Sequence, residues 1–321
     1  MNVHLHFTLL LYKGKLHPML LVILLYALFG IVFVASKTAL EGGSPFFFVA
    51  FRMSFSAACL IGYLLFTDRS ALKVNKGALK LIALIGMFNI YLTNALEYWA
   101  LQYMSAARTC FIYSLSPFLS ALFAYFYLNE RLNMRKWVSM LTGFGGISII
   151  FLGKESSDAT FTAFSILSWP ELAALGAACA TVFGWVFMKE AMQKYNCSFV
   201  TANAYSMLLG GVIGIAHSLM TEEWRPIPVH DYNKFFMGAI TTSIISNMIC
   251  YNLYGYLLKK FTASFMSFSG LLSPLFTAIF EWLFLGTRVG WYFFAACSVT
   301  ITSLYLFYKE ELKQIRKIDS T

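Results

Sequence analysis

Residues 116–131 read SPFLSALFAYFYLNER, and residues 273–288 read SPLFTAIFEWLFLGTR. Six of these sixteen positions are identical, and most of the others exchange one large apolar residue for another. The two stretches lie 157 residues apart, about half of the 321-residue chain. A second pair, FGIVF at 29–33 and FGWVF at 183–187, repeats with a spacing of 154 residues. The chain is therefore predicted to contain two copies of one structural unit.

The composition places most of this chain in lipid. Hydrophobic residues make up 59% of the sequence and charged residues only 12%, whereas soluble globular proteins carry about 25% charged residues. The 32 Phe and seven Trp residues exceed what a water-soluble surface could cover. Two soluble domains are therefore excluded, and an internally duplicated membrane protein is predicted. In membranes such duplication is typical of transporters.

Motifs for catalysis, metal binding and nucleotide binding are missing from the sequence. It holds no G-x-x-x-x-G-K-[ST] segment, no H-E-x-x-H and no grouped Ser, His and Asp. The six Cys residues stand singly in or beside apolar stretches, which indicates packing roles. We therefore expect no catalytic residue, no metal and no cofactor, and an enzyme is disfavoured. The net charge of +9 comes from basic residues between apolar stretches, which indicates contact with membrane lipid and not with nucleic acid.

Apolar stretches of about 20 residues, the length that crosses a bilayer, occur ten times. The expected fold is an all-α membrane protein with ten transmembrane helices. Residues 1–17 form an N-terminal tail without a cleavage site, so no removable signal peptide is expected. Residues 18–152 form the first five-helix repeat, 153–168 a linker, 169–308 the second repeat and 309–321 a C-terminal tail. The ten stretches are 18–37, 45–66, 78–97, 106–127, 136–152, 169–188, 199–220, 233–253, 263–284 and 289–308.

The distribution of basic residues predicts the orientation of these helices. With ten spans and a cytoplasmic N-terminus, 17 Lys and Arg residues fall on the cytoplasmic side and five on the opposite side. This bias favours cytoplasmic positions for both termini. Because five spans are an odd number, the second copy enters the membrane with the opposite orientation. Such an inverted repeat places its binding site near the membrane midplane, where the two copies meet.

With these features the sequence resembles the drug/metabolite transporter superfamily, in its EamA branch, over residues 18–308. The second copy departs from the pattern at one position, where Thr287 stands in place of the Glu that ends the fourth span. The residues that carry the resemblance are Pro45, Phe48, Phe51, Arg52 and Ala57 in the second span, the Ser-Pro pairs Ser116, Pro117, Ser273 and Pro274, and Glu130.

The resemblance implies a secondary transporter of a small polar metabolite in a bacterial inner membrane. Within the family the chain is similar to the S-adenosylmethionine importers of obligate intracellular bacteria. This similarity implies S-adenosylmethionine as the solute, with S-adenosylhomocysteine as a candidate for exchange. Two alternatives stay open: an exporter of amino acids or drug-like compounds, and a membrane scaffold that transports nothing. Both a monomer and a homodimer are compatible with the sequence.

Ionisable residues inside the spans are candidates for charge recognition or coupling, because each costs about 2.5–3.5 kcal/mol at a helix centre. Arg52 in the second span either pairs with a carboxylate or solute, or serves structure by contacting backbone carbonyls. Glu281 in the ninth span is a candidate proton or cation site, and a Glu bound to a neighbouring helix is the alternative. Glu97, near the outer end of the third span, either faces a cationic solute or lies in interfacial water.

Amides and aromatic residues supply the remaining candidates for solute contact. Amides at i and i+5 lie about 140° apart around a helix, so one of each pair is expected in the cavity and the other between helices. Aromatic faces attract cations and stack on flat rings, although packing and interface anchoring are the alternatives. The candidates are Asn89, Asn94, Asn247 and Asn252 among the amides, and Tyr91, Tyr113, Trp185, Tyr251 and Tyr254 among the aromatic residues.

Pro117 and Pro274 lie at equivalent positions in the two copies. Proline removes a backbone hydrogen bond and kinks a helix. The two residues are therefore candidate hinges for gates, and passive kinks are the alternative.

Overall fold

The computed structural model describes residues 17–103, 109, 112–128, 132–153, 168–285 and 291–319. These residues are almost entirely helical, and the only extended pairing among them is an isolated bridge between Gly43 and Val229. The predicted all-α class is confirmed.

Residues of the first copy form α2 (Pro18–Leu40), α3 (Pro45–Thr67), the short 3₁₀ helix η1 (Arg69–Leu72), α4 (Lys76–Ile85), the π-helical segment η2 (Gly86–Leu92), α5 (Thr93–Tyr103), α7 (Ser116–Leu128) and α8 (Met134–Gly153). Residues of the second copy form α9 (Trp169–Tyr195), α10 (Phe199–Thr221), α11 (Tyr232–Thr242), the π-helical segment η3 (Ser243–Cys250), α12 (Tyr251–Leu257), α13 (Ala263–Ser269), α14 (Leu272–Leu285) and α15 (Trp291–Asp319).

Local sequence explains where several helices begin and end. Helices α2, α3 and α9 each begin with a proline in the first turn. Backbone N–H groups in the first turn have no partner within the helix, so proline, which lacks an N–H, costs no hydrogen bond there, and its fixed φ suits the helix. Helix α9 ends at Asn196, which adopts the left-handed conformation with φ of 49°. Asn tolerates this conformation better than most side chains, so it is a common helix terminator.

Six helices in the described part of the chain are long and apolar enough to cross a bilayer. The chain is therefore a multi-pass membrane protein, and the count of ten spans stays a prediction. The six are Pro18–Leu40, Pro45–Thr67, Lys76–Tyr103, Trp169–Tyr195, Phe199–Thr221 and Ala263–Phe280.

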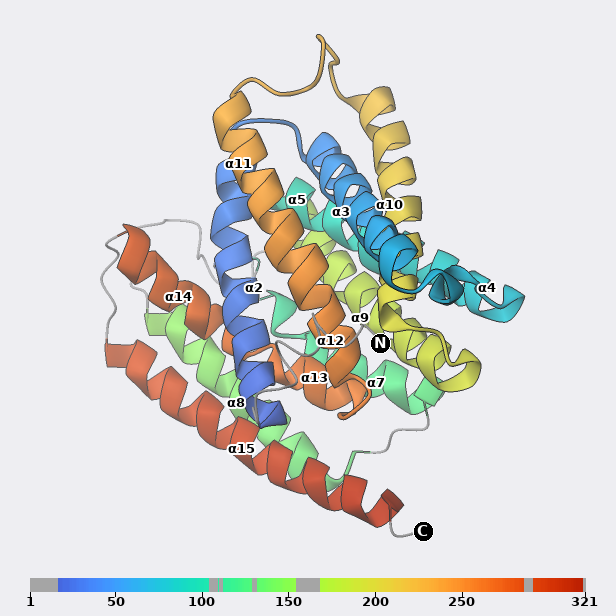
Figure 1. Ribbon diagram of the computed structural model, residues 1–321. Coiled ribbons are helices and arrows are strands. Elements are labelled where there is room, and N and C mark those ends of the chain that lie inside the picture. Colours follow the sequence, from blue (N-terminus) through green and yellow to red (C-terminus); the bar gives the residue numbers. More distant parts are fainter. Residues whose placement is uncertain are drawn as a thin grey trace.

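The main contacts that a helix makes in one copy are made by its counterpart in the other copy (Figure 1). Helix α3 packs against its counterpart α10, and α8 packs along its counterpart α15. Helix α2 packs against α11 and α14, and its counterpart α9 packs against α4 and α7, which are the equivalent helices of the other copy. The core therefore lies where the copies meet.

The helices break at equivalent places. The π-helical segments η2 and η3 begin at Gly86 and Ser243, which is again a spacing of 157 residues. Turns at residues 114–115 and 270–271 interrupt the helices two to four residues before Pro117 and Pro274. Each interruption lies before a proline, which cannot supply the backbone hydrogen bond that a continuous helix requires.

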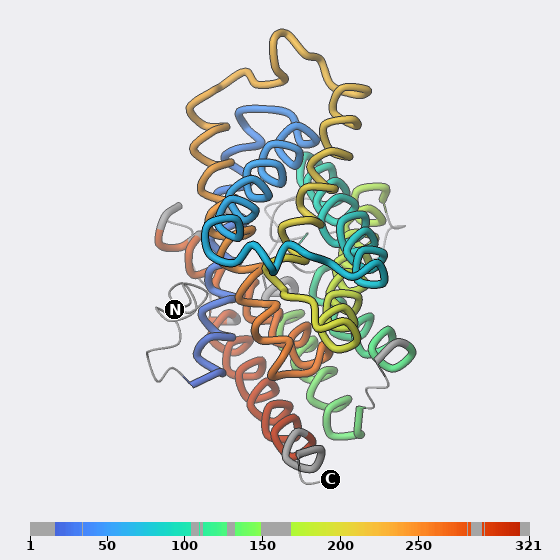
Figure 2. Tube along the Cα trace, turned by 45° about the vertical axis from the view of Figure 1, so that its right-hand side comes forward, coloured from blue at the N-terminus to red at the C-terminus, as the bar shows by residue number. Residues whose placement is uncertain are grey.

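The connection between α10 and α11 lies within the second copy and contacts the first copy at one end of the bundle. Figure 2 shows this connection rising beyond that end, with the end of α15 at the opposite one. The carboxylate of Glu222 accepts hydrogen bonds from the backbone N–H groups of Phe46 and Phe47, at 2.8 and 2.9 Å. A carboxylate at a helix N-terminus is stabilising, so this contact fixes the start of α3.

Candidate binding cavity

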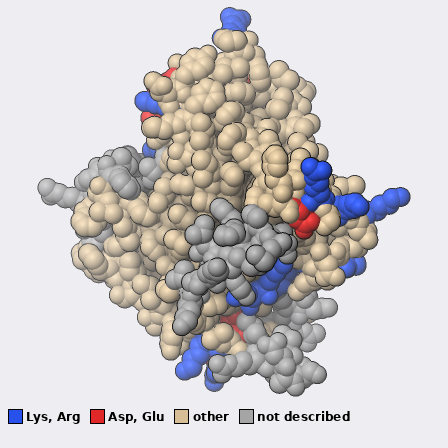
Figure 3. Space-filling model, in the orientation of Figure 1, with Lys and Arg blue, Asp and Glu red and all other residues tan. Residues whose placement is uncertain are grey.

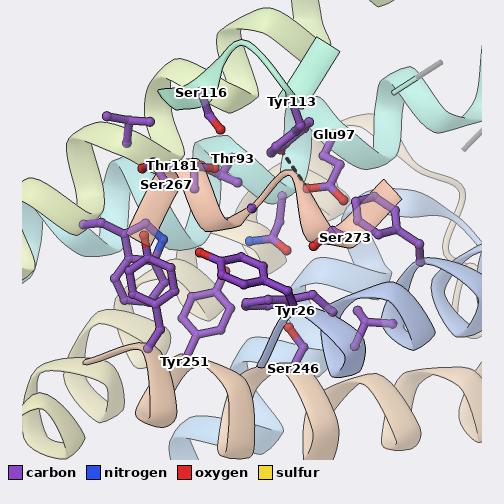
Figure 4. A pocket seen from close by; sticks show the side chains of 18 of the residues that line it. Tyr26, Thr93, Glu97, Tyr113, Ser116, Thr181, Ser246, Tyr251, Ser267 and Ser273 are labelled. Carbon is purple, nitrogen blue, oxygen red and sulfur yellow. Dashed lines mark hydrogen bonds between the residues drawn. The ribbon is translucent and has the colours of Figure 1, made fainter. Parts of the chain in front are cut away.

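A cavity of about 160 Å³ lies between the two copies. Side chains from both copies converge on it (Figure 4). Its walls combine aromatic rings, small hydroxyl residues and one carboxylate, which is a composition suited to a small polar solute with a flat ring. The lining residues are Tyr26, Phe29, Val32, Phe33, Ser36, Thr93, Asn94, Glu97, Tyr98, Tyr113, Ser114, Ser116, Thr181, Val182, Trp185, Ser246, Tyr251, Tyr254, Ser267, Gly270, Ser273 and Pro274.

Among the described lining residues, Glu97 is the only charged one. It projects from α5, and the hydroxyl of Tyr113 donates a hydrogen bond to its Oε2 at 2.8 Å (Figure 4). Asn94, Glu97 and Tyr98 lie at i, i+3 and i+4 on α5, so they share one face of the helix. A half-buried carboxylate on this face gives the cavity a negative side that suits a cation.

Aromatic rings form another part of the wall. Trp185 on α9 stacks on Tyr254 of α12, with ring centroids 3.9 Å apart and an angle of 19° between the planes. Tyr251 contacts the same indole ring at 5.3 Å. Tyr26 of α2 closes the wall and donates its hydroxyl to the carbonyl of Met266. Such a surface attracts cations and binds flat heterocycles.

Hydroxyl residues form a further part of the lining, and the sequence interpretation missed most of them. The hydroxyls of Thr93 and Thr181 lie 3.1 Å apart and bridge α5 and α9. Ser267, Ser273 and Ser116 come from the segments around the two helix breaks (Figure 4). The repeated Ser-Pro pairs were the signal available for Ser116 and Ser273, because each serine precedes the proline where the helix is interrupted.

Arg52 lies outside the lining and is 1% exposed. Its guanidinium donates hydrogen bonds to the hydroxyl of Tyr98 and, at 2.9 Å, to Oδ1 of Asn247. It also lies 5.1 Å from the ring centre of Phe48. Asn247 in turn donates to the hydroxyl of Ser56 at 3.1 Å. This network joins α3 to η3, so the geometry favours the structural interpretation of Arg52, and its link to the cavity runs through Tyr98.

The other candidates divide between the cavity and the helix interfaces. Asn94, Tyr113, Trp185, Tyr251, Tyr254 and Pro274 line the cavity. The remaining five candidates with described side chains are outside its lining: Asn89, Tyr91, Asn247, Asn252 and Pro117.

Helix packing explains two of these positions. Tyr91 bonds to His217 at 2.8 Å, and Asn89 packs on Gly184, where a Cβ atom would lie 2.1 Å from that of Asn89. Of the amide pair on the third span, only Asn94 faces the cavity, as the 140° separation requires. Of the second pair neither does, because Asn252 accepts from Asn203 at 3.0 Å and Asn247 binds Arg52. The side chain of Glu281 lies outside the described part of the structure.

A polar cavity between two copies of a helical membrane unit is typical of membrane transporters. The chain belongs to the EamA-like transporter family, whose model matches residues 17–152 and 168–309. A Chlamydia muridarum protein named S-adenosylmethionine/S-adenosylhomocysteine transporter is 34% identical over 283 residues, covering 88% of each chain. The protein of that name from Chlamydia trachomatis serovar L2 is also 34% identical, covering 88% of this chain and 86% of the relative.

More distant matches are found in both sequence and structure. The uncharacterized transporter YoaV of Bacillus subtilis is 24% identical over 276 residues, covering 84% of this chain and 89% of the relative. One solved crystal structure superposes with a TM-score of 0.70 at 16% identity, covering 92% of this chain and 97% of that one. At this identity the likeness concerns the fold alone.

Proposed function

We propose that this chain is a secondary transporter that takes up S-adenosylmethionine across a bacterial inner membrane in exchange for S-adenosylhomocysteine. The observation that carries the proposal is the combination of one carboxylate, Glu97, with the ring stack of Trp185 and Tyr254 in a single cavity. S-adenosylmethionine has a sulfonium cation and an adenine ring, which these two features complement. The named Chlamydia relatives support the same solute.

In this arrangement the adenine stacks on Trp185 and the sulfonium faces Glu97. The hydroxyl groups of Thr93, Thr181 and Ser246 are available to the ribose. The cavity of about 160 Å³ is smaller than the roughly 300–1,000 Å³ of typical ligand pockets. A nucleoside-sized solute therefore requires the cavity to widen, which is expected of a protein that alternates between open states.

The proposed mechanism is alternating access in a ten-span inverted repeat with both termini in the cytoplasm. The corresponding helix contacts in the two copies support this architecture. The helix breaks before Pro117 and Pro274 support a role as bending points, since Tyr113 and Gly270, four residues before each proline, line the cavity. Discontinuous helices of this kind surround the solute in other inverted-repeat transporters.

Uptake into proteoliposomes tests the proposal directly. We expect saturable entry of labelled S-adenosylmethionine that is accelerated by S-adenosylhomocysteine loaded inside the vesicles. Amino acids and drug-like cations added to the same assay should compete weakly. Absence of saturable uptake would exclude the proposed solute. Selective efflux of an amino acid or drug-like compound from loaded vesicles would establish the exporter instead.

A further inference from the structure

A second hollow lies away from the cavity, at the ends of α8 and α15. It has a volume of about 430 Å³ and forms a groove where the first turns of α8 meet the later turns of α15. Both Figure 1 and Figure 2 show these two helices side by side along one flank of the molecule. The groove is lined by Met134, Arg135, Val138 and Ser139 of α8 and by Leu306, Lys309, Glu310 and Lys313 of α15.

The groove carries an excess of positive charge. Glu310 accepts hydrogen bonds from Lys313 at 2.8 Å and from Arg135 at 3.1 Å. Its side chain is 13% exposed, whereas those of Arg135 and Lys313 are 74% and 55% exposed. The hydrogen bond from Lys313, followed by those from Arg135 and Asn133, lowers the pKa of Glu310 to about 2. The ionised Glu310 thus holds Arg135 and Lys313 close together, and both side chains remain exposed to solvent. Lys309 adds a third positive charge to the groove.

Apolar side chains continue the groove beyond these charges. Val138 and Leu306 line it and are 55% and 50% exposed. Leu141 and Tyr305 lie near them in sequence on the same two helices and are each 61% exposed. In a membrane protein, large exposed apolar residues face lipid, and aromatic residues gather at the boundary with water. The groove therefore runs from a basic end to an apolar one.

The walls of this groove are held rigidly. Lys136, one residue after Arg135, forms an ion pair of 2.5 Å with Glu311, one residue after Glu310. Both side chains are fully buried, at 1% and 0% exposed. The Glu311 carboxylate also accepts from the backbone N–H of Thr262 at 2.7 Å. A site fixed in this way before its ligand arrives loses little freedom on binding.

We propose that this groove binds the headgroup of an anionic phospholipid, with its acyl chains along Val138 and Leu306. A phosphate between Arg135, Lys309 and Lys313 balances the positive excess, and basic pockets between spanning helices are the usual sites for such headgroups. A soluble anion would leave the apolar end uncovered. Figure 3 shows that Lys and Arg also gather on the right-hand part of the molecule, where α4 lies in Figure 1. The test must therefore separate this groove from general electrostatic attraction.

Lipid binding to the purified full-length chain tests the proposal, with phosphatidylglycerol and phosphatidylcholine as probes in detergent. The groove variant replaces Arg135, Lys309 and Lys313 by Gln. The matched control replaces Lys73, Lys76 and Lys80 by Gln and removes the same charge beside α4. Native mass spectrometry measures bound lipid, and the rise in melting temperature measures its stabilising effect.

We expect wild type and control to bind phosphatidylglycerol equally and in preference to phosphatidylcholine. The groove variant should bind it at least tenfold more weakly, since each basic residue near anionic lipid contributes about fivefold. Lys309→Gln alone should cost about fivefold and alters none of the ion pairs seen at this groove, which guards against misfolding of the triple variant. Inorganic phosphate should not compete. Equal losses in groove variant and control, or equal binding of the two lipids, would overturn the proposal.

Discussion

Replacing Glu97 by Gln tests which charge of the solute the cavity recognises. The change keeps the volume of the side chain and an oxygen for the hydrogen bond from Tyr113, which is 2.8 Å long. S-adenosylmethionine carries a sulfonium cation, whereas S-adenosylhomocysteine has a neutral thioether and the same amino group. If Glu97 faces the sulfonium, Glu97→Gln weakens the binding of S-adenosylmethionine and leaves that of S-adenosylhomocysteine nearly unchanged.

The expected size of this effect follows from the position of Glu97. Two unit charges about 4 Å apart attract by roughly 4 kcal/mol at an effective dielectric constant of about 20. Water reaches part of this half-buried side chain, and pairs that are fully in solvent contribute only about 0–1 kcal/mol. An intermediate value of about 2 kcal/mol corresponds to a roughly 30-fold increase in the concentration that half-saturates uptake.

Initial rates of uptake into proteoliposomes measure this change for each solute. Glu190→Gln on α9 is the matched control, because it removes a 28% exposed carboxylate that pairs with Lys194 at 3.7 Å outside the cavity. The control should behave as wild type. An unchanged half-saturating concentration of S-adenosylmethionine in Glu97→Gln would refute the reasoning. Equal losses for both solutes would assign Glu97 to the amino group instead.

Three further substitutions probe the cavity and its frame. Tyr113→Phe should raise the half-saturating concentration of S-adenosylmethionine about tenfold, since hydrogen bonds to charged groups contribute about 1.5–3 kcal/mol. Tyr91→Phe is the matched control, because it also removes a hydrogen-bonded hydroxyl but lies outside the cavity, and it should leave uptake unchanged. Trp185→Ala should weaken both solutes about tenfold in the same assay, because stacking on an aromatic ring contributes about 1–3 kcal/mol per base. Lys136→Met should destabilise the protein by about 3–5 kcal/mol, because it leaves a charge buried alone. Thermal unfolding in detergent measures this loss, and adding Glu311→Gln should restore most of it.

The sequence alone predicted the helical class and the membrane setting, because both follow from composition summed over long stretches. It also predicted the helix breaks, since proline acts on its own backbone wherever it stands. The identity of the cavity residues depends instead on which helices meet. Ser267 and Thr181 carry no local signal. Arg52, for which a coupling role and a structural role both stayed open, is bound by Tyr98 and Asn247 from other helices. Only tertiary packing distinguishes such a buried network from a solute site.

The repeat spacing also shows which positions of the two copies correspond. Asn89 and Asn94 stand 158 residues before Asn247 and Asn252, whereas the Ser-Pro stretches and the π-helical segments repeat at 157, so these amides are not at equivalent positions.

At the spacing of 157, Asn94 corresponds to Tyr251 and Glu97 corresponds to Tyr254, and all four residues line the cavity. The carboxylate of Glu97 in the first copy and the ring of Tyr254 in the second copy, which stacks on Trp185, therefore occupy equivalent positions of the repeat. A strictly repeated pair would give the cavity two carboxylates or two stacked rings. An asymmetric solute with a cation at one end and a heterocycle at the other requires the copies to differ at these positions, while Ser116 and Ser273, at the repeated breaks, stay the same.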